Sequence, residues 1–126
     1  MSTTKYPTLA EALRLHQVLI ARFGGTEGVR DPGALESALY RPQSGYYETL
    51  TQQAAALMQS LAMNHSFIDG NKRVAFSLTT IFIRMNGFRL VVDADSAERF
   101  VIERLIGGHA PIDEIPAWLG KHMVRV

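Results

Sequence analysis

The chain has no cysteine among its 126 residues. Disulfide bonds, thiolate chemistry and cysteine-based zinc sites are therefore excluded, and the composition suits a reducing compartment. An excess of one charge is also missing, since 13 lysines and arginines face 12 aspartates and glutamates, with both signs scattered along the sequence. That balance gives no electrostatic footprint for direct nucleic-acid binding, so we expect no nucleic-acid partner.

The sequence also has no long uninterrupted hydrophobic run. Its longest apolar stretch, Val74 to Met85, is broken by hydroxyl residues and by Arg84, and nothing at the N-terminus resembles a signal peptide. Because a membrane-spanning helix needs about 20 apolar residues, we expect no membrane association and a cytoplasmic protein. No linker, repeat or low-complexity tract divides the chain, which predicts a single domain over residues 1–126.

Helix-boundary residues and helical periodicity are present along most of the chain. Thr8 followed by Glu11 has the spacing of a capping box, and Asp31-Pro32 places a cap residue before a first-turn proline. We therefore predict a mainly α fold, a compact helical bundle, with a short extended piece at 88–92. The predicted helices cover residues 9–23, 32–39, 49–64, 71–86, 96–106 and 112–123, and residues 40–48 are predicted to form a loop.

The most informative segment is His65-Ser66-Phe67-Ile68-Asp69-Gly70-Asn71-Lys72-Arg73, which connects two of these apolar helices. A helix start presents unpaired backbone N–H groups and a partial positive charge, so the amides of residues 71–73 should form an anion cradle. Gly70 can take a positive φ and lets a phosphate approach the backbone, and Asn71 suits the cap position. The segment therefore predicts a phosphate site.

Charged side chains complete this predicted site. Lys72 adds a point charge and Arg73 a forked guanidinium, and both have the wrong sign for a helix start unless an anion binds there. His65 can accept a proton from a hydroxyl, because the ordinary pKa of histidine lies near neutrality. Asp69 is a hard oxygen ligand suited to Mg²⁺. The set suggests phosphoryl or nucleotidyl transfer, and the structural alternative is an ordinary turn with solvated cations.

Other chemistry-bearing side chains have structural interpretations. Phe67 should anchor the motif loop in the core, and His16, on the apolar face of the first helix, is expected to be a packed and hydrogen-bonded core residue. His109 and His122 have no partner at metal-ligand spacing. Trp118 and its neighbour Leu119 are expected in the core.

The pattern His65-x-Phe67-x-Asp69-Gly70-Asn71-Lys72-Arg73 closely resembles the signature of the Fic/Doc superfamily. Lys72, where the adenylylating Fic branch carries glycine, resembles the Doc (death-on-curing) branch. The likeness extends to Leu15-His16, Arg22-Phe23-Gly24-Gly25, Asp31-Pro32-Gly33 and Asn86-Gly87. It implies a Fic-like helical bundle in which the active-site loop lies between two central helices.

The resemblance also implies an activity. In Fic adenylyltransferases a second arginine follows the first by three positions, whereas here that position is Phe76. Doc-like members resemble kinases, so the implied reaction uses ATP and Mg²⁺ to phosphorylate a protein hydroxyl, with elongation factor Tu as the implied target. His65 would be the catalytic base, Asp69 the metal ligand, and Gly70, Asn71, Lys72 and Arg73 the nucleotide-binding residues.

Partners and alternatives follow from the same resemblance. Residues 40–48 correspond to a flap that guides the target, so Arg41, Tyr46 and Tyr47 are possible target contacts, with a plain surface loop as the alternative. The inhibitory pattern (Ser/Thr)-x-x-x-Glu-(Gly/Asn) is missing, which implies a toxin restrained by a separate antitoxin that supplies an inhibitory helix. Two other functions stay open: a Fic-type adenylyltransferase, and a catalytically silent binding partner of an antitoxin.

Overall fold

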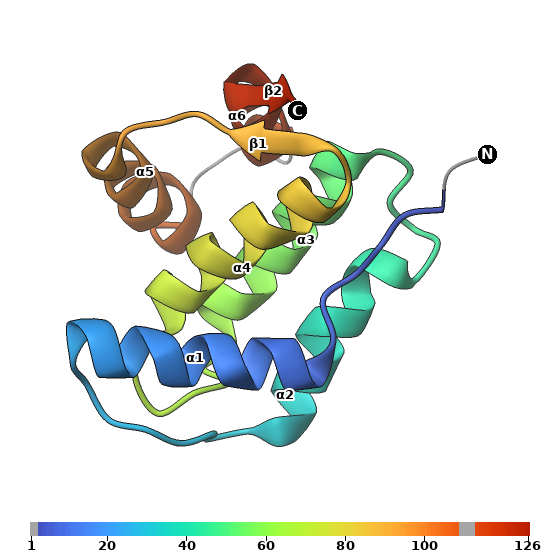
Figure 1. Ribbon diagram of the computed structural model, residues 1–126. Helices are drawn as coiled ribbons and strands as arrows, with labels where there is room; N and C mark the ends of the chain where they lie inside the picture. The colour runs from blue at the N-terminus through green and yellow to red at the C-terminus, as the bar shows by residue number, and fades with distance from the viewer. Residues whose placement is uncertain (1–2, 109–112) are drawn as a thin grey trace.

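A computed structural model of the chain describes residues 3–108 and 113–126 as a mainly helical bundle (Figure 1). Helices α3 and α4 run side by side through the centre, α1 crosses one end of this pair, and a small two-stranded sheet lies at the other end (Figure 1). The predicted mainly α fold is thus confirmed. The elements are α1 (Leu9–Phe23), α2 (Pro32–Tyr40), η1 (Arg41–Gln43), α3 (Leu50–Met63), α4 (Asn71–Met85), β1 (Phe88–Leu90), α5 (Ala94–Phe100), η2 (Val101–Ile106), α6 (Glu114–His122) and β2 (Met123–Arg125).

Side-chain caps fix where the first three α-helices begin. Thr8 and Glu11 form the predicted capping box of α1, in which each side chain accepts a hydrogen bond from the other residue's backbone N–H. The Asp31 carboxylate accepts from the Ala34 amide at 3.0 Å and starts α2. Thr49 opens α3 with a second capping box. These caps lie in the sequence itself, which is why the predicted starts agree with the observed ones.

Two helix predictions are wrong. Gly70, not Asn71, is the cap residue of α4: Gly70 has φ +77° in the left-handed region, and Asn71 is the first helical residue. The predicted continuous helix over 96–106 is instead the α-helix α5 followed by the π-helical turn η2. At the end of η2 the Gly107 amide donates to the Ile102 carbonyl at 3.2 Å, a wider ring than an α-helix closes.

Other boundaries move by a few residues. The predicted loop at 40–48 contains the short 3₁₀ turn η1, and the extended piece at 88–92 shortens to β1, which pairs antiparallel with β2. The last predicted helix begins at Glu114 rather than at 112, and residues 109–112, His109 included, lie outside the described part of the chain.

The core lies between α3 and α4 and extends to α6. The largest fully buried side chains include Leu57 and Met58 of α3 and Phe82 of α4. Leu119 is also fully buried, as predicted, whereas Trp118 is only partly buried and stacks on Phe100 with ring centroids 4.0 Å apart. This packing holds the two central helices together, and the loop between them is the predicted active-site segment.

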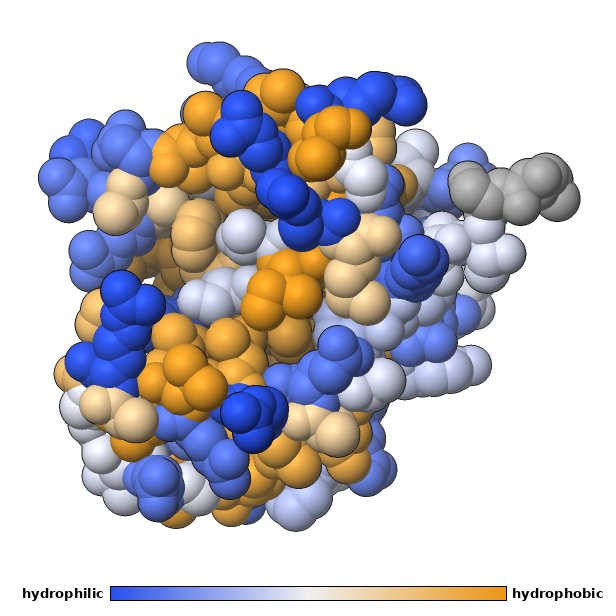
Figure 2. Space-filling model, viewed as in Figure 1, coloured by the Kyte–Doolittle hydropathy of each residue, from blue (hydrophilic) through white to orange (hydrophobic). Residues whose placement is uncertain are grey.

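The surface is mixed in character. On the face drawn in Figure 2, hydrophilic side chains break up the apolar surface over α1. Among the helices of the described residues, none is both long and apolar enough to pass through a bilayer.

Candidate active site

The motif loop joins α3 to α4 and is held along its backbone by the segment that joins α1 to α2 (Figure 1). The Ile68 amide donates to the Gly28 carbonyl at 3.1 Å. In the other direction, the amides of Arg30 and Asp31 donate to the Ser66 carbonyl at 2.8 and 3.0 Å. These backbone hydrogen bonds fix the path of the loop independently of its exposed side chains.

Phe67 and His16 support the loop from below. Phe67 is 1% exposed, and its ring stacks on the His16 imidazole at a centroid distance of 4.0 Å and an interplanar angle of 9°. His16 Nε2 lies 2.9 Å from the Asp69 carbonyl oxygen, so this nitrogen carries the proton and donates. The expected roles of Phe67 as an anchor and of His16 as a packed, hydrogen-bonded residue are both confirmed.

Asn71 clamps the turn by its side chain. Its Oδ1 accepts from the Phe67 amide at 3.0 Å, and its Nδ2 donates to the Phe67 carbonyl at 2.9 Å. Both ends of the Asn71 amide are therefore hydrogen-bonded to the backbone of one residue. This leaves the backbone N–H of Asn71 as its contribution to an anion site at the start of α4.

His65 stands at a strained position of this loop. It is the one non-glycine residue with positive φ among the described residues, at +54°. Histidine is among the few residue types that tolerate this left-handed conformation, which costs of order 1–3 kcal/mol. The imidazole is exposed, and no hydrogen bond to it is formed by residues 3–108 or 113–126. The strain thus presents an imidazole whose nitrogens are both open to a substrate.

Asp69 is held by two backbone amides. Its Oδ2 accepts from Thr26 at 3.0 Å and its Oδ1 accepts from Gly70 at 2.9 Å. Gly25 leaves room for this arrangement, because a Cβ at that position would lie 2.7 Å from Asp69 Oδ2. Each carboxylate oxygen keeps a further lone pair for a cation.

This donor set fits Mg²⁺ held mainly by substrate. Within the described part of the chain no three histidine, aspartate or glutamate side chains gather to hold a metal by themselves. Mg²⁺ commonly binds to one or two carboxylates and takes its remaining ligands from water and substrate phosphates. Asp69 is exposed and can supply the carboxylate.

Positive groups converge at the start of α4. The first α4 amide that bonds back along the chain is that of Val74, which donates to the Gly70 carbonyl at 3.0 Å, so the three amides before it are available to an anion. Lys72 and Arg73 are exposed beside them. Arg73 also lies over the ring of Phe23, with its guanidinium carbon 4.3 Å from the ring centroid. The predicted phosphate-binding residues are therefore brought together.

The predicted target-flap residues lie next to α3. Arg41 donates to the Tyr47 hydroxyl at 2.7 Å and to Ser60 Oγ at 2.9 Å, so these two flap residues form one unit tied to the helix that leads into the motif. Tyr46 is 80% exposed and packs edge-on against Tyr47. Arg41 and Tyr47 thus fix the loop, and Tyr46 is the side chain of this set that is free to meet a partner.

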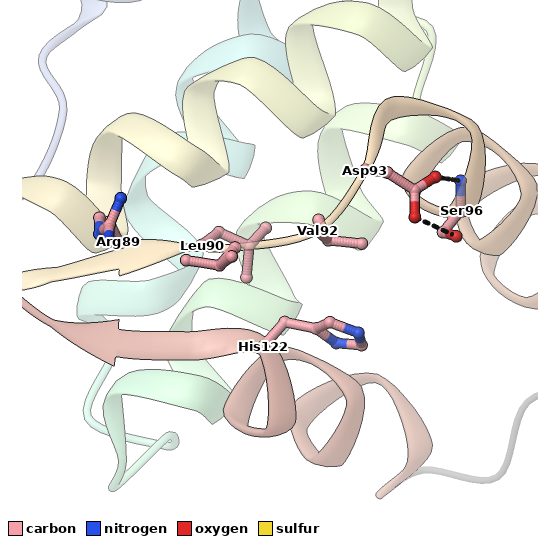
Figure 3. A pocket seen from close by; sticks show the side chains of 7 residues that line it. Arg89, Leu90, Val92, Asp93, Ser96 and His122 are labelled. Atoms are coloured by element: carbon pink, nitrogen blue, oxygen red, sulfur yellow. Dashed lines mark hydrogen bonds between the residues drawn. The ribbon is translucent and has the colours of Figure 1, made fainter.

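A separate hollow among the described residues lies away from the motif loop. It measures about 600 Å³ and is lined by residues of the β1–α5 connection and by His122 (Figure 3). Two of its polar side chains already have hydrogen-bond partners: Asp93 accepts from Ser96, and His122 Nδ1 donates to the Trp118 carbonyl. Arg89 points away from His122 in Figure 3, so the polar side chains do not converge.

Sequence reasoning missed several supporting contacts. The Asn71 clamp, the bond between Thr26 and Asp69, and the Arg73 contact with Phe23 all join positions whose proximity depends on the fold. The segment Phe23-Gly24-Gly25 is part of the family resemblance, but its residue types do not indicate which motif side chains it contacts.

Comparison with known proteins agrees with this geometry. The family model described as Fic/DOC family matches residues 6–83, a range that contains α1 to α3, the motif loop and most of α4. The chain is similar to Toxin Doc of Mycolicibacterium smegmatis, with 43% identity over 95 residues that cover 69% of this chain and 73% of that protein. It is also similar to Protein kinase doc of Escherichia phage P1, with 34% identity over 92 residues covering 70% and 73%. The chain belongs to the Fic/DOC family, on its Doc branch.

Proposed function

We propose that this protein is a Doc-like toxin that transfers the γ-phosphoryl group of ATP to a hydroxyl of elongation factor Tu and thereby stops protein synthesis. The relatives named Toxin Doc and Protein kinase doc support a toxin and a kinase. The observation that carries the proposal is the motif junction, where the free imidazole of His65 lies on the same short loop as the unpaired amides and cations that start α4.

The reaction uses each group of this junction in a definite way. His65 accepts the proton of the target hydroxyl, whose oxygen forms a bond to the γ-phosphorus. The bond between that phosphorus and the bridging oxygen breaks, and ADP leaves with the electron pair. The amides of residues 71–73, with the side chains of Lys72 and Arg73, stabilise the negative charge on the phosphate oxygens.

Asp69 would hold the metal in this scheme. Mg²⁺ bound there would supply further positive charge to the phosphate oxygens. The Asp69 carboxylate is oriented by Thr26 and Gly70, so its free lone pairs keep a fixed direction. Gly70 starts α4 with φ +77°, a left-handed conformation that favours glycine.

Phosphoryl transfer is preferred over AMP transfer because of Phe76. This side chain packs against the core of the molecule, at the position where an adenylylating relative would place a second arginine. No guanidinium three positions after Arg73 is therefore available to hold a nucleotide in the sense that AMP transfer needs.

An antitoxin partner belongs to the proposal. One relative is named Toxin Doc, and for a toxin of this kind we expect a separate antitoxin whose helix covers the motif junction. The exposed Tyr46 of the flap would contact either this partner or the target.

The test is to incubate the purified protein with elongation factor Tu, ATP and Mg²⁺ and to measure the intact mass of the target. The proposal expects an increment of one phosphoryl group. An AMP-sized increment would establish adenylylation instead, and an unmodified target would overturn the assignment of elongation factor Tu. A protein that neither binds ATP nor arrests growth on expression would be a silent binding module.

A further inference from the structure

Two arginines from different helices meet at one aromatic ring beside the motif. Arg22, in the last turn of α1, has its guanidinium carbon 5.5 Å from the centroid of Phe23, and Arg73, in the first turn of α4, has its guanidinium carbon at 4.3 Å. The Phe23 side chain is 55% exposed. The exposed ring is therefore accessible to both guanidinium groups at the surface.

This cluster of Arg22, Phe23 and Arg73 adjoins the anion cradle. Phe23 directly precedes Gly24 and the segment in which Thr26 donates to the Asp69 carboxylate at 3.0 Å. The end of α1 therefore contacts the start of α4 through the ring of Phe23 and the guanidinium of Arg73. The segment after α1 also bonds to Asp69, just before α4. A ligand held by the α4 amides would therefore lie beside the contact between Arg73 and Phe23.

The charges of the cluster are not balanced by protein groups. Among residues 3–108 and 113–126, the ion pair that forms is Arg104 with Glu114, and neither Arg22 nor Arg73 has a carboxylate at salt-bridge distance. The place of Arg22 at the end of α1 suits the helix dipole, but the dipole does not explain why it shares a ring with a second arginine. Two like charges near one ring disfavour each other, and an anion beside them would relieve that repulsion.

We propose that Arg22 is a further phosphate-binding residue, and that Phe23 holds Arg22 and Arg73 as a pair for the phosphate chain of a nucleoside triphosphate. Stacking on the ring orients a guanidinium at little entropic cost while its N–H groups stay free to donate. Arg22 would thereby supply the second guanidinium of the site from α1, where the α4 position three residues after Arg73 is the apolar Phe76. This inference rests on the proposed function, since it takes the polyphosphate as the ligand.

The experiment measures the affinity of the full chain for Mg²⁺–ATP and for inorganic tripolyphosphate, together with thermal unfolding. Arg22→Gln keeps a polar side chain that can donate hydrogen bonds but removes the positive charge. We expect it to weaken the binding of both ligands by roughly tenfold or more, the usual loss for a charge-assisted hydrogen bond, with an unchanged unfolding midpoint. Arg22→Lys should recover part of the loss.

A matched control and a second variant separate binding from folding. Arg14→Gln removes an exposed charge from the same helix two turns earlier and should bind both ligands as the unaltered chain does. Phe23→Leu should weaken binding by freeing both arginines, and Phe23→Tyr, which keeps the ring face, should lose less.

Three results would overturn the inference. Arg22→Gln binding both ligands as tightly as the unaltered chain would show that Arg22 does not touch phosphate. A loss for ATP alone would place Arg22 near the base or ribose, and a loss that follows a fall in unfolding midpoint would make its role structural. The proposed function fails separately, if the unaltered chain itself neither binds ATP nor transfers phosphate.

Discussion

The motif junction and the hollow beside β1 differ in what their polar groups have left to offer. In the hollow, Asp93 accepts two hydrogen bonds from Ser96, and His122 donates to its own helix. At the junction, the His65 ring, the first amides of α4 and two arginines have no protein partner of the complementary kind among the described residues. We therefore place the proposed chemistry at the junction, because its polar groups still have hydrogen-bonding capacity to offer a ligand.

The two regions also differ in how they are held. Hydrogen bonds from Asn71 and His16 and a stacked Phe67 fix the backbone of the motif loop, which places reactive groups on a rigid base. The β1–α5 connection is shaped by ordinary helix capping at Asp93. The family match ends at residue 83, before β1, and so separates the same two regions.

The largest effect on phosphate transfer should come from replacing His65 at the motif junction, with His122 in the hollow as the matched comparison. His65→Asn removes the base but keeps a residue that tolerates positive φ, so phosphate transfer should fall by about 10²–10⁴-fold with little change in unfolding. The matched His122→Asn in the hollow should leave transfer unchanged. Rates of phosphate incorporation into elongation factor Tu would measure both. Equal rates for the two variants would remove the distinction between the regions.

A large loss of stability should follow from Asn71→Ala. The change leaves the Phe67 amide and carbonyl without the partners that the Asn71 side chain supplies, which costs about 1–3 kcal/mol in the free energy of unfolding. Transfer should fall as well, because the loop that carries His65 loosens. Denaturant unfolding measures the first effect, and Gln17→Ala, an exposed amide on α1, provides the control. A stable but inactive Asn71→Ala variant would point to a direct phosphate contact of the side chain.

His16→Phe should have a smaller effect on stability. The variant keeps the stack on Phe67 but loses the hydrogen bond to the Asp69 carbonyl, so we expect a loss of about 1 kcal/mol in the free energy of unfolding. A fall in the transfer rate without a change in KM for ATP would indicate that His16 positions the loop. An unchanged rate would mean that the loop keeps its course without this bond.

The smallest effect concerns the contribution of Asp93, which lines the hollow, to the stability of the protein in acid. Hydrogen bonds from the Ser96 amide and hydroxyl lower the pKa of Asp93 below its ordinary value of 3.8. Because the folded pKa is the lower one, the stabilisation is complete above that ordinary value and is lost as the pH falls through the folded pKa. The free energy of unfolding of Asp93→Asn should therefore be lower than that of the unaltered chain at neutral pH. The difference should shrink in acid. A difference in the free energy of unfolding that stayed constant down to the lowest pH would contradict a lowered pKa of Asp93.

Much of the fold was predictable because its signals are local. Thr8 with Glu11, Asp31 with Pro32, and Thr49 mark helix starts by hydrogen bonds that span three residues, and the structure places the helices there. The cap of α4 was mispredicted because two neighbouring residues both suit it, and the left-handed backbone of Gly70 decided between them. The π-turn η2 leaves no trace in a 3.6-residue periodicity.

For the candidate site, the sequence predicts the residues but not the contacts that orient them. The nine-residue motif contains the groups predicted to be reactive, and its position between two apolar helices follows from the sequence alone. What orients these groups depends on distant positions, such as Thr26 for Asp69 and Phe23 for Arg73. Such contacts exist only after α1 has packed across the ends of α3 and α4, and no local pattern encodes them.

The most direct test asks which phosphate of ATP reaches elongation factor Tu. The protein would be incubated with the target and Mg²⁺ in parallel reactions containing ATP labelled at the γ-phosphate or at the α-phosphate, with His65→Asn alongside. The account predicts label on the target from γ-labelled ATP alone, and none in the His65→Asn reaction. Label from α-labelled ATP would contradict it, because that result would make the motif junction an adenylylating site.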